Sequence, residues 1–275
     1  MTTYYLALDL GAESGRLIHG TLEKGRLSVQ ELHRFLNTPI QKGDSLHWDI
    51  ENLFQEVMIG LRKAAERDDP ISSISCSSWG LDYVLFDAKG NVLSPSHHYR
   101  DPRTGKVVDQ VLKKIPWEDI FAETGIQFMP INTLFQLAAE PGRRLRKADK
   151  LLTIGDAFNY LLSGTAKVDQ SGASTTQLYN PRTESWSRTL LHALDLPAEV
   201  FPPIVPCGTR LGVLRPEIGK QTRLQHEDID RVEVVASCSH DTAAAVAAVP
   251  AVGRDWAFLS SGTWSLLGTE SPVPL

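Results

Sequence analysis

Three apolar runs, each separated from the next by a glycine-containing turn, open the chain. They cover residues 4–10, 15–22 and 27–35, and the turns between them contain Gly11 and Gly25. Short runs of this kind, separated by turn residues, are typical of an antiparallel meander. The pattern therefore predicts three consecutive antiparallel strands.

The spacing of apolar residues then changes from strand to helix and back. Between residues 50 and 65 apolar side chains recur every three or four positions, and Asp49 is suited to cap the start of that helix. Residues 71–78 alternate apolar and small side chains, and a hairpin with strands at 82–87 and 92–94 follows. The order of three strands, a helix and a strand is the start of a ribonuclease H-like mixed sheet, an α/β fold flanked by helices. In open sheets with helices, ligands bind at the carboxyl ends of strands.

Short helices dominate the middle of the chain, from residue 102 to about residue 187, where proline and glycine interrupt them. Residues 164–180 are rich in serine, threonine and glycine, and we expect them to form an excursion on the surface. The pattern predicts one more unit after this region. It consists of a strand at 232–238, a helix at 240–249 and a strand–turn–strand at 257–269.

Composition and charge narrow the class of protein. The 275 residues are 42% hydrophobic and 22% charged, which is ordinary for a globular protein with a large core. No apolar run approaches the roughly 20 residues that span a bilayer, and the N-terminus has no export signal, so we expect a cytoplasmic protein without membrane contact. The net charge of -5 and the lack of a basic tract make nucleic acid an unexpected partner. Cys76, Cys207 and Cys238 fit neither a disulfide framework nor a zinc knuckle.

The junction after the first predicted strand joins an acidic residue to a turn of small residues. Asp9 stands at the end of the strand, and Gly11 and Gly15 let the main chain turn tightly and approach a ligand closely. Successive N–H groups in such a turn form a nest for anions, and Asp9 is suited to a hydrated Mg²⁺ that bridges phosphate oxygens. An ordinary hairpin with a glycine-rich turn explains the same residues, so this segment alone leaves both interpretations open.

A second acidic residue, Asp241, stands where the later strand gives way to a helix of small residues. As a capping residue it would only satisfy backbone N–H groups. As a functional residue it would be a carboxylate that orients and deprotonates a substrate hydroxyl. The local pattern does not decide between these two roles.

Residues 77–83 place Trp79, Gly80 and Asp82 at the junction of two predicted strands. The flat face of a tryptophan suits the C–H face of a sugar, glycine lets a hydroxyl reach the backbone, and a carboxylate accepts hydroxyl hydrogen bonds. A β-turn with a tryptophan in the core is the alternative, and for Trp79 alone burial habits favour it. Residues 256–266 also repeat, weakly, the strand–turn–strand pattern of residues 5–17.

Taken together, these segments resemble the FGGY carbohydrate kinases of the sugar kinase, Hsp70 and actin group. The resemblance covers essentially the whole chain in the expected order, and that order is more specific than any single motif. The segments that carry it are LDLGAESGR at 8–16, SWGLD at 78–82, YRD at 99–101, NTLFQL at 132–137, SHDTA at 239–243 and SGTWS at 261–265.

The resemblance implies a role for each matching residue. Asp9 would lie near a Mg²⁺ ion, and Asp241 would be the general base that takes a proton from a terminal hydroxyl of the sugar. Thr263 would belong to a second phosphate-binding turn. The residues expected around the ketose are Trp79, Gly80, Asp82, His240 and Asp241, and those expected around the ATP phosphates are Ala12, Glu13, Ser14, Gly15, Arg16 and Thr263.

The implied activity is ATP-dependent phosphorylation of a ketose, with L-rhamnulose expected first and L-fuculose or L-xylulose as alternatives. Family members continue for about another 150–250 residues, so we expect residues 1–249 to be the sugar-binding domain and residues 250–275 the beginning of a nucleotide-binding domain. The chain alone would then be nearly inactive. A non-catalytic sugar-binding fragment is the alternative. A third possibility is an ATPase of the same fold that binds no sugar, and residues 79–82 argue against it.

Overall fold

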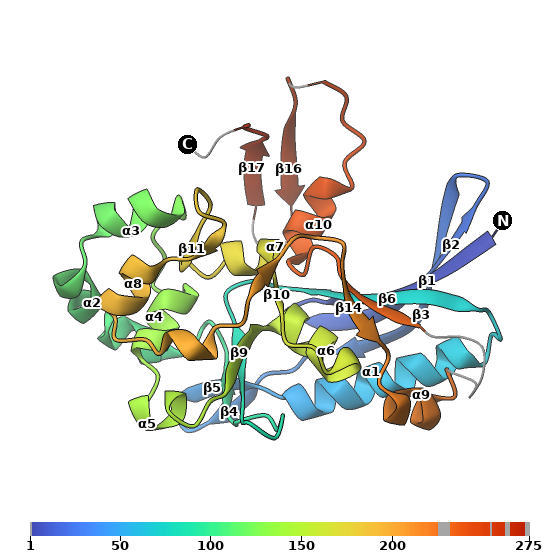
Figure 1. The fold of residues 1–275 in the computed structure, drawn as a ribbon, viewed down its shortest axis with the longest axis horizontal. Coiled ribbons are helices and arrows are strands. Elements are labelled where there is room, and N and C mark those ends of the chain that lie inside the picture. The colour runs from blue at the N-terminus through green and yellow to red at the C-terminus, as the bar shows by residue number, and fades with distance from the viewer. Residues whose placement is uncertain (1, 225–231, 254, 262–264, 273–275) are drawn as a thin grey trace.

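A mixed β-sheet is the centre of the computed structural model, which describes residues 2–224, 232–253, 255–261 and 265–272 (Figure 1). Within these residues the sheet has six strands in the order β14-β15-β6-β1-β2-β3. β1 is parallel to β6 and β6 is parallel to β15, whereas the other neighbouring pairs are antiparallel. The strands are β1 (Thr2–Leu10), β2 (Ser14–Glu23), β3 (Arg26–Leu36), β6 (Ile71–Ser78), β14 (Thr209–Val213) and β15 (Glu233–Ala236). The predicted meander, later strands and mixed sheet are confirmed.

Helices α1 (Ile50–Ala65), α6 (Ile154–Ser163) and α9 (Pro216–Thr222) lie on the same side of this sheet in Figure 1. The predicted cap of α1 is confirmed, since Asp49 Oδ1 accepts a hydrogen bond from the Asn52 N–H at 3.0 Å. A side chain at Gly60 would lie 3.2 Å from Leu17 of β2, so glycine lets α1 approach the sheet closely. The main hydrophobic core lies between these helices and the sheet.

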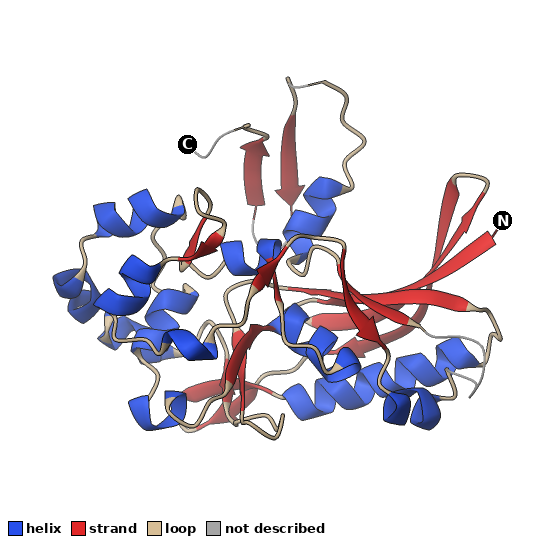
Figure 2. Cartoon of the chain, viewed as in Figure 1, coloured by secondary structure: helices blue, strands red, loops and turns tan. Residues whose placement is uncertain are grey.

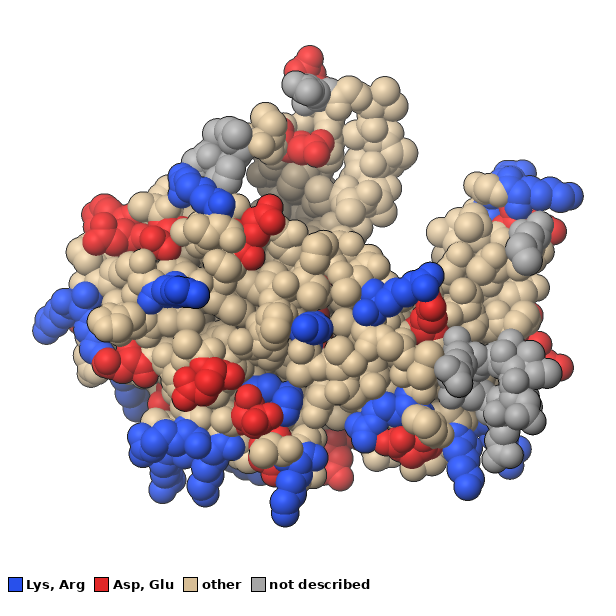
Figure 3. Space-filling view, in the orientation of Figure 1, with Lys and Arg blue, Asp and Glu red and all other residues tan. Residues whose placement is uncertain are grey.

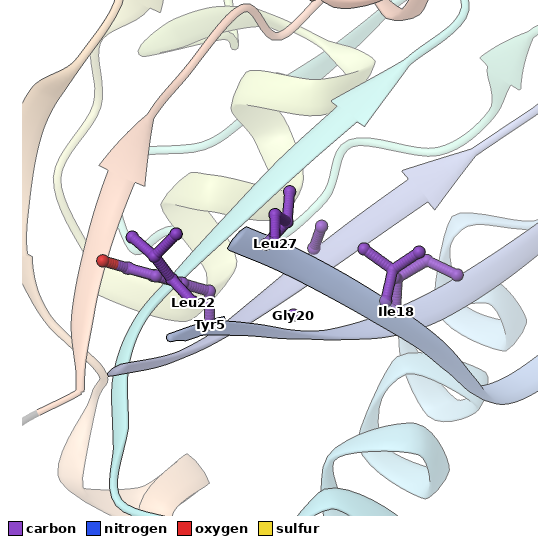
Figure 4. A pocket seen from close by; sticks show the side chains of 7 residues that line it. Tyr5, Ile18, Gly20, Leu22 and Leu27 are labelled. Carbon is purple, nitrogen blue, oxygen red and sulfur yellow. The ribbon is translucent and has the colours of Figure 1, made fainter. Parts of the chain in front are cut away.

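The outer face of β1, β2 and β3 carries an apolar pocket (Figure 4). Its side chains alternate with those that enter the main core, as the two-residue period of a strand requires. Leu27 and Val29 are exposed there. The residues that line the pocket are Tyr5, Ala7, Ile18, Gly20, Leu22, Leu27 and Val29. None of these described lining residues carries a carboxylate or an imidazole.

Short helices gather at the end of the molecule remote from β1 and β2, which Figure 2 shows as a cluster of blue ribbons on the left. They enclose a second hydrophobic core that includes Leu85, Phe135 and Leu190. The helical prediction for the middle of the chain is confirmed. The helices are α2 (Val108–Lys114), α3 (Trp117–Thr124), α4 (Thr133–Ala138), α5 (Gly142–Leu145) and α8 (Arg188–Ala193), with single 3₁₀ turns η1 (Pro102–Lys106) and η2 (Ala198–Val200).

Several short strands were not predicted, and one predicted hairpin pairs differently. β7 (Tyr83–Phe86) has its ladder with β9 (Lys150–Thr153), while the returning segment adds a single bridge from Phe86 to Val92. The remaining short strands also form pairs. Some of these pairs join strands that are adjacent in the sequence, and others join strands that are far apart in it. They involve β4 (Ile40–Lys42), β5 (Ser45–Trp48), β8 (Ser96–His97), β10 (Val168–Asp169), β11 (Tyr179–Asn180), β12 (Ser185–Trp186) and β13 (Ile204–Val205).

The predicted surface excursion at 164–180 is wrong. Helix α7 (Gln170–Ser174) is partly buried, and Asp169, Ala173 and Gln177 are buried. The polar side chains of this segment satisfy its own backbone. Thr176 Oγ1, for example, donates to the Ala173 carbonyl oxygen at 2.7 Å. A run of serine and threonine can therefore be buried once its hydroxyl groups have partners.

Helix α10 (Asp241–Ala247) leads to the antiparallel pair β16 (Ala257–Ser261) and β17 (Ser265–Thr269). Both predicted strands are confirmed, whereas their turn, which contains Thr263, lies outside the described residues. Figure 3 shows this pair standing away from the body of the molecule, and Leu259 and Leu267 are exposed. Among the described residues, none of the helices has the length and apolar character needed to cross a membrane.

Candidate active site

The carboxyl ends of β1, β6 and β15 meet at one edge of the sheet. Leu10 pairs with Ser78, and Ser78 forms a parallel bridge with His240 just beyond β15. This register brings Asp9 and Asp241 to the same edge from opposite ends of the sequence. Ligands bind at such an edge in open sheets with helices, so it is our candidate active site.

The first turn is a hairpin turn and also lies at this edge, so the two interpretations of its residues are compatible. The Gly11 N–H donates to the Ser14 carbonyl oxygen at 2.9 Å. Asn37, which follows β3, donates its backbone N–H to the Glu13 carbonyl oxygen at 3.0 Å and its side-chain Nδ2 to the Gly11 carbonyl oxygen at 3.0 Å. These bonds hold the turn in a single shape.

Gly15 is required by packing within the protein rather than by a ligand. A Cβ atom there would lie 2.3 Å from Cζ of Phe35, which is closer than real contacts allow. Ala12 is partly exposed and Glu13 is exposed, so the tip of the turn is open to a ligand. The turn is therefore tightly packed where it joins β2 and accessible to a ligand at its tip.

Asp9 and Arg16 form an ion pair across β1 and β2. Arg16 Nε lies 2.8 Å from Asp9 Oδ2, and each side chain is about one-third exposed at 34% and 37%. Ion pairs with this much water around them contribute little to stability. An incoming anion and cation can therefore separate the two charges at small cost.

The predicted base, Asp241, is the first residue of α10, and the N-cap position belongs to His240. Asp241 is therefore not the N-cap residue itself, although its side chain still accepts a backbone N–H of the first turn. Asp241 Oδ1 accepts hydrogen bonds from the backbone N–H of Thr242 at 2.5 Å and from Thr242 Oγ1 at 3.1 Å. His240 Nε2 lies 3.6 Å from the same oxygen.

Partial burial changes the proton affinity of both groups. It raises the pKa of Asp241, and the negative charge of Asp9 raises that pKa further. Burial also lowers the pKa of His240, which favours the neutral imidazole. A carboxylate with a raised pKa is a stronger base. Asp241 is therefore suited to accept a proton from a hydroxyl group.

Asp82 lies beneath this edge and accepts four hydrogen bonds from the protein. Oδ2 accepts from Trp48 Nε1 at 2.6 Å, Trp79 Nε1 at 2.9 Å and the Tyr99 backbone N–H at 3.2 Å. Oδ1 accepts from Gln136 Nε2 at 2.7 Å. Burial raises the pKa of Asp82 to about 6 despite these donors.

The expectation that Asp82 and Trp79 meet a sugar directly is therefore corrected. Asp82 is only 1% exposed, and its oxygens already have protein donors. Trp79 is 7% exposed, and its ring lies 4.3 Å from that of Trp48, centroid to centroid. The structure supports the alternative in which Trp79 is a core residue. The hydrogen bond between Trp79 and Asp82 holds the segment that follows β6.

Gly80 and Leu81 form the part of that segment closest to α7. A Cβ atom on Gly80 would lie 2.9 Å from Thr175 Cγ2, so glycine makes room for the residue that follows α7. Leu81 has a φ of 76°, a left-handed conformation that costs free energy for a residue with a branched side chain. Its carbonyl oxygen accepts from Thr133 Oγ1 at 2.5 Å and Gln136 Nε2 at 3.2 Å, which hold it in this conformation.

Two buried aspartates support the segment before Asp241, and the sequence interpretation missed both. Asp169 Oδ1 accepts a hydrogen bond from the Ser239 backbone N–H at 3.1 Å. Asp156 Oδ2 accepts from Ser239 Oγ at 3.2 Å and from Thr153 Oγ1 at 2.6 Å. Asp156 interrupts an apolar stretch, and that isolated acid was the available signal.

The backbone of Ser239 is also held by direct packing. Its carbonyl oxygen accepts from the Ser78 N–H at 2.8 Å, and a Cβ atom on Gly155 would lie 2.6 Å from it. The next N–H, that of His240, donates to Ser171 Oγ at 3.2 Å. Helices α6 and α7 together therefore fix the position from which α10 begins.

Replacing Asp156 with asparagine is expected to change how stability depends on pH. Burial is the main cause that raises the pKa of Asp156, to about 7, above the ordinary 3.8. The stability that this group contributes is fully present below its unfolded pKa and is lost as pH rises through the folded pKa. Asparagine resembles the protonated acid at every pH. Relative to wild type, the variant should gain about 1 kcal/mol of unfolding free energy per pH unit within this window.

Urea unfolding of both proteins between about pH 5 and pH 8 measures this difference. The matched control is Asp87→Asn, because Asp87 lies in an exposed turn and accepts hydrogen bonds from Lys89 and Asn91 there. A difference between the Asp156 variant and wild type that stays constant over this range would contradict the prediction.

A second cluster of metal-type ligands lies near β5 and β8. Ligand atoms of His47, His97 and Asp101 lie within 4.8 Å of one another. Burial and the positive charges of Arg103 and Arg144 lower the pKa of both imidazoles, that of His97 to about 4. Those two guanidinium groups also disfavour a divalent cation, so we do not treat this cluster as a metal centre.

Solved structures of similar fold are sugar kinases. A xylulose kinase from Lactobacillus acidophilus matches with a TM-score of 0.82 and 19% identity, over 96% of this chain and 54% of that one. A carbohydrate kinase from Novosphingobium aromaticivorans matches with a TM-score of 0.81 and 23% identity, over 99% of this chain and 57% of that one. These matches confirm the actin and Hsp70-like fold.

Curated relatives are more similar in sequence. A rhamnulokinase from Lactiplantibacillus plantarum is 40% identical over 270 residues, and one from Bacillus subtilis is 38% identical over 271 residues. Each alignment covers 98% of this chain but only 54% and 55% of the relative. The chain therefore spans about half the length of these relatives.

The family model for the N-terminal domain of the FGGY family of carbohydrate kinases matches residues 4–248. That range contains the three strand ends of the candidate site together with Asp9 and Asp241. The expected resemblance is thereby confirmed: the chain belongs to the FGGY family of carbohydrate kinases.

Proposed function

We propose that this chain carries the sugar-binding and base-bearing part of an ATP-dependent ketose kinase, which converts L-rhamnulose to L-rhamnulose 1-phosphate. The observation that carries the proposal is the partly buried Asp241, whose pKa is raised at the edge where three parallel strands end. The rhamnulokinases that match at about 40% identity support the choice of ketose.

Asp241 acts as the general base in this proposal. It accepts the proton of the terminal hydroxyl as that oxygen forms a bond to the γ-phosphorus, while the bond to the β-phosphate oxygen breaks and ADP leaves. Phosphoryl transfer needs mainly positioning and charge neutralisation. The fixed Ser239 backbone supplies the positioning of the base. His240 and the backbone at Gly80 are the proposed contacts for the other hydroxyl groups of the sugar.

The turn from Ala12 to Arg16 is the proposed site for the ATP phosphates, with Arg16 as their counter-charge. Asp9 is the proposed ligand of Mg²⁺, a cation that prefers carboxylate oxygens and neutralises phosphate charge. Asp9 suits such an ion because its carboxylate is partly exposed and because Arg16, which pairs with it at 2.8 Å, can turn to the phosphates when the cation binds. Thr263 would add a phosphate contact from the second turn.

We assign residues 1–249 to the sugar-binding domain and residues 250–275 to the beginning of the nucleotide-binding domain. The separate pairing of β16 with β17 supports this boundary. A sugar-binding fragment without catalysis is the alternative function. L-fuculose or L-xylulose are the alternative ketoses.

Titration of this chain with ketoses tests the proposal. L-rhamnulose should raise the unfolding temperature more than L-fuculose or L-xylulose at equal concentration, because a ligand that binds only the folded state stabilises it. L-rhamnose, the aldose isomer, is the matched control ligand. The same titration with His240→Ala should show weaker stabilisation, since the variant removes a proposed sugar contact.

The second test uses the complete reading frame that contains this chain, because phosphorylation is proposed for the whole protein. With ATP and L-rhamnulose it should release ADP and a ketose phosphate. Ketose binding without phosphorylation by that protein would favour the non-catalytic alternative. An absence of binding by every ketose would remove the proposal altogether.

A further inference from the structure

Two cysteines lie side by side at the candidate site, Cys207 just before β14 begins and Cys238 just after β15 ends. The ladder pairs Thr209 with Ala236, and the Gly208 N–H donates to the Ala236 carbonyl oxygen at 2.6 Å. The ladder ends there, and a turn closed by the Thr209 N–H, which donates to the Pro206 carbonyl oxygen at 3.3 Å, brings Cys207 beside Cys238. Their Sγ atoms are 3.5 Å apart, and both thiols are free.

Cys238 begins the segment that carries the proposed base. It has a φ of 48°, a left-handed conformation for a residue with a side chain, and Ser239, His240 and Asp241 follow it directly. The chain therefore changes direction at Cys238 on its way from β15 to α10. A covalent bond to the Cys238 sulfur therefore alters the residue that sets the direction of the chain toward α10.

Cys207 is connected to the same segment from the other side. Its thiol interacts with the carboxylate of Asp169, whose Oδ1 accepts the Ser239 N–H. Desolvation of the thiol and the neighbouring Asp169 raise the pKa of Cys207 to about 12. Cys207 is therefore protonated at neutral pH.

We propose that Cys207 and Cys238 are a modification site, at which a low-molecular-weight disulfide converts the two thiols into an intrachain disulfide that displaces the segment carrying Asp241. Cys207 is exposed and Cys238 is partly exposed, so a small disulfide reaches the pair. Cys76 is buried and takes no part.

The reaction proceeds by two thiol–disulfide exchanges. The Cys238 thiolate attacks one sulfur of the small disulfide, which forms a mixed disulfide and expels one small thiolate. Cys207 then gives its proton to water, attacks the Cys238 sulfur, forms the intrachain bond and expels the second small thiolate. The protein loses two electrons and two protons, and the small disulfide becomes two thiols. Excess thiol reverses both steps.

Bond formation changes the geometry of the site because a disulfide is short. The two sulfur atoms must approach from 3.5 Å to about 2.05 Å. Oxidation also removes the thiol hydrogen of Cys207 next to Asp169. Both changes act on the hydrogen bond between Asp169 and Ser239, which places the start of α10. Displacements of this size are enough to misalign reacting groups.

Oxidised glutathione is the probe that tests this proposal. The reduced 275-residue chain is incubated with it, digested without reduction and measured by mass spectrometry. We expect linked peptides that contain Cys207 and Cys238 and are two hydrogens lighter than the free pair. Amide hydrogen exchange of the peptide with Ser239 and His240 should become faster. Affinity for L-rhamnulose should fall about tenfold, as expected when one hydrogen bond that shapes the site is weakened.

The double variant Cys207→Ser and Cys238→Ser is the matched control, and neither its exchange nor its ketose affinity should respond to oxidised glutathione. Recovery of both thiols free, or of glutathione adducts alone, would overturn the proposal. So would a linked pair with unchanged exchange. Only the affinity measurement rests on the proposed function. If the reduced chain binds no ketose, the proposed function fails. The peptide masses and the amide hydrogen exchange still decide whether the disulfide forms and displaces the segment.

Discussion

Replacing Asp241 with asparagine is expected to lower the rate of L-rhamnulose phosphorylation by about 10²–10⁴-fold, the usual contribution of a general base. The variant keeps the shape of the side chain and removes its ability to accept a proton. Affinity for the ketose should change little, since an asparagine oxygen still accepts a hydrogen bond from a hydroxyl. Loss of kcat with an unchanged KM is the expected signature.

The measurement uses the complete reading frame that contains this chain, with ADP release as the readout. The pH profile separates a base from a structural residue. Because the pKa of Asp241 is raised, the wild-type rate should rise with pH as this carboxyl ionises, and the variant should lose that dependence. Asp241→Glu is the matched control, which retains a base in a displaced position and should recover part of the rate. Full activity in Asp241→Asn would remove Asp241 from this role.

Local patterns in the sequence were sufficient for the elements that form the framework of the site. Strands β1 to β3 and helix α1 were predicted because each follows a simple period and has clear turn or capping residues, such as Gly25 and Asp49. Asp9 and Asp241 were chosen as candidates because Asp9 stands at the end of an apolar strand and Asp241 follows another. Their meeting at one edge needed only the rule that parallel strands end together.

The interior of the site could not be predicted from the same patterns. The contacts of Asp82 join it to Trp48, Tyr99 and Gln136, which are remote in sequence, so nothing local marks it as a buried acceptor. The serine- and threonine-rich segment around α7 was misjudged for a related reason. Composition reports polarity, whereas burial depends on whether each hydroxyl finds a partner.

Replacing Asp82 with alanine is expected to destabilise the chain by about 4–6 kcal/mol, a large part of the stability of an ordinary domain. The substitution leaves four donors without their acceptor, from Trp48, Trp79, Tyr99 and Gln136. Each buried donor without a partner costs about 1–3 kcal/mol, and water entering the cavity recovers part of this. Urea unfolding followed by tryptophan fluorescence measures the change.

Asp87→Ala is the matched control for this variant, because Asp87 also accepts hydrogen bonds from Asn91 and Lys89 but does so in an exposed turn. Water replaces the lost acceptor there, so the control should lose about 1 kcal/mol. Equal losses in the two variants would show that burial of the Asp82 network adds no stability. A much larger loss at Asp82 would identify the network as the support of Trp79. The backbone N–H of Trp79 donates to the Leu10 carbonyl oxygen at 3.2 Å. Since Leu10 begins the first turn, the network would then maintain the proposed phosphate site as well as the core.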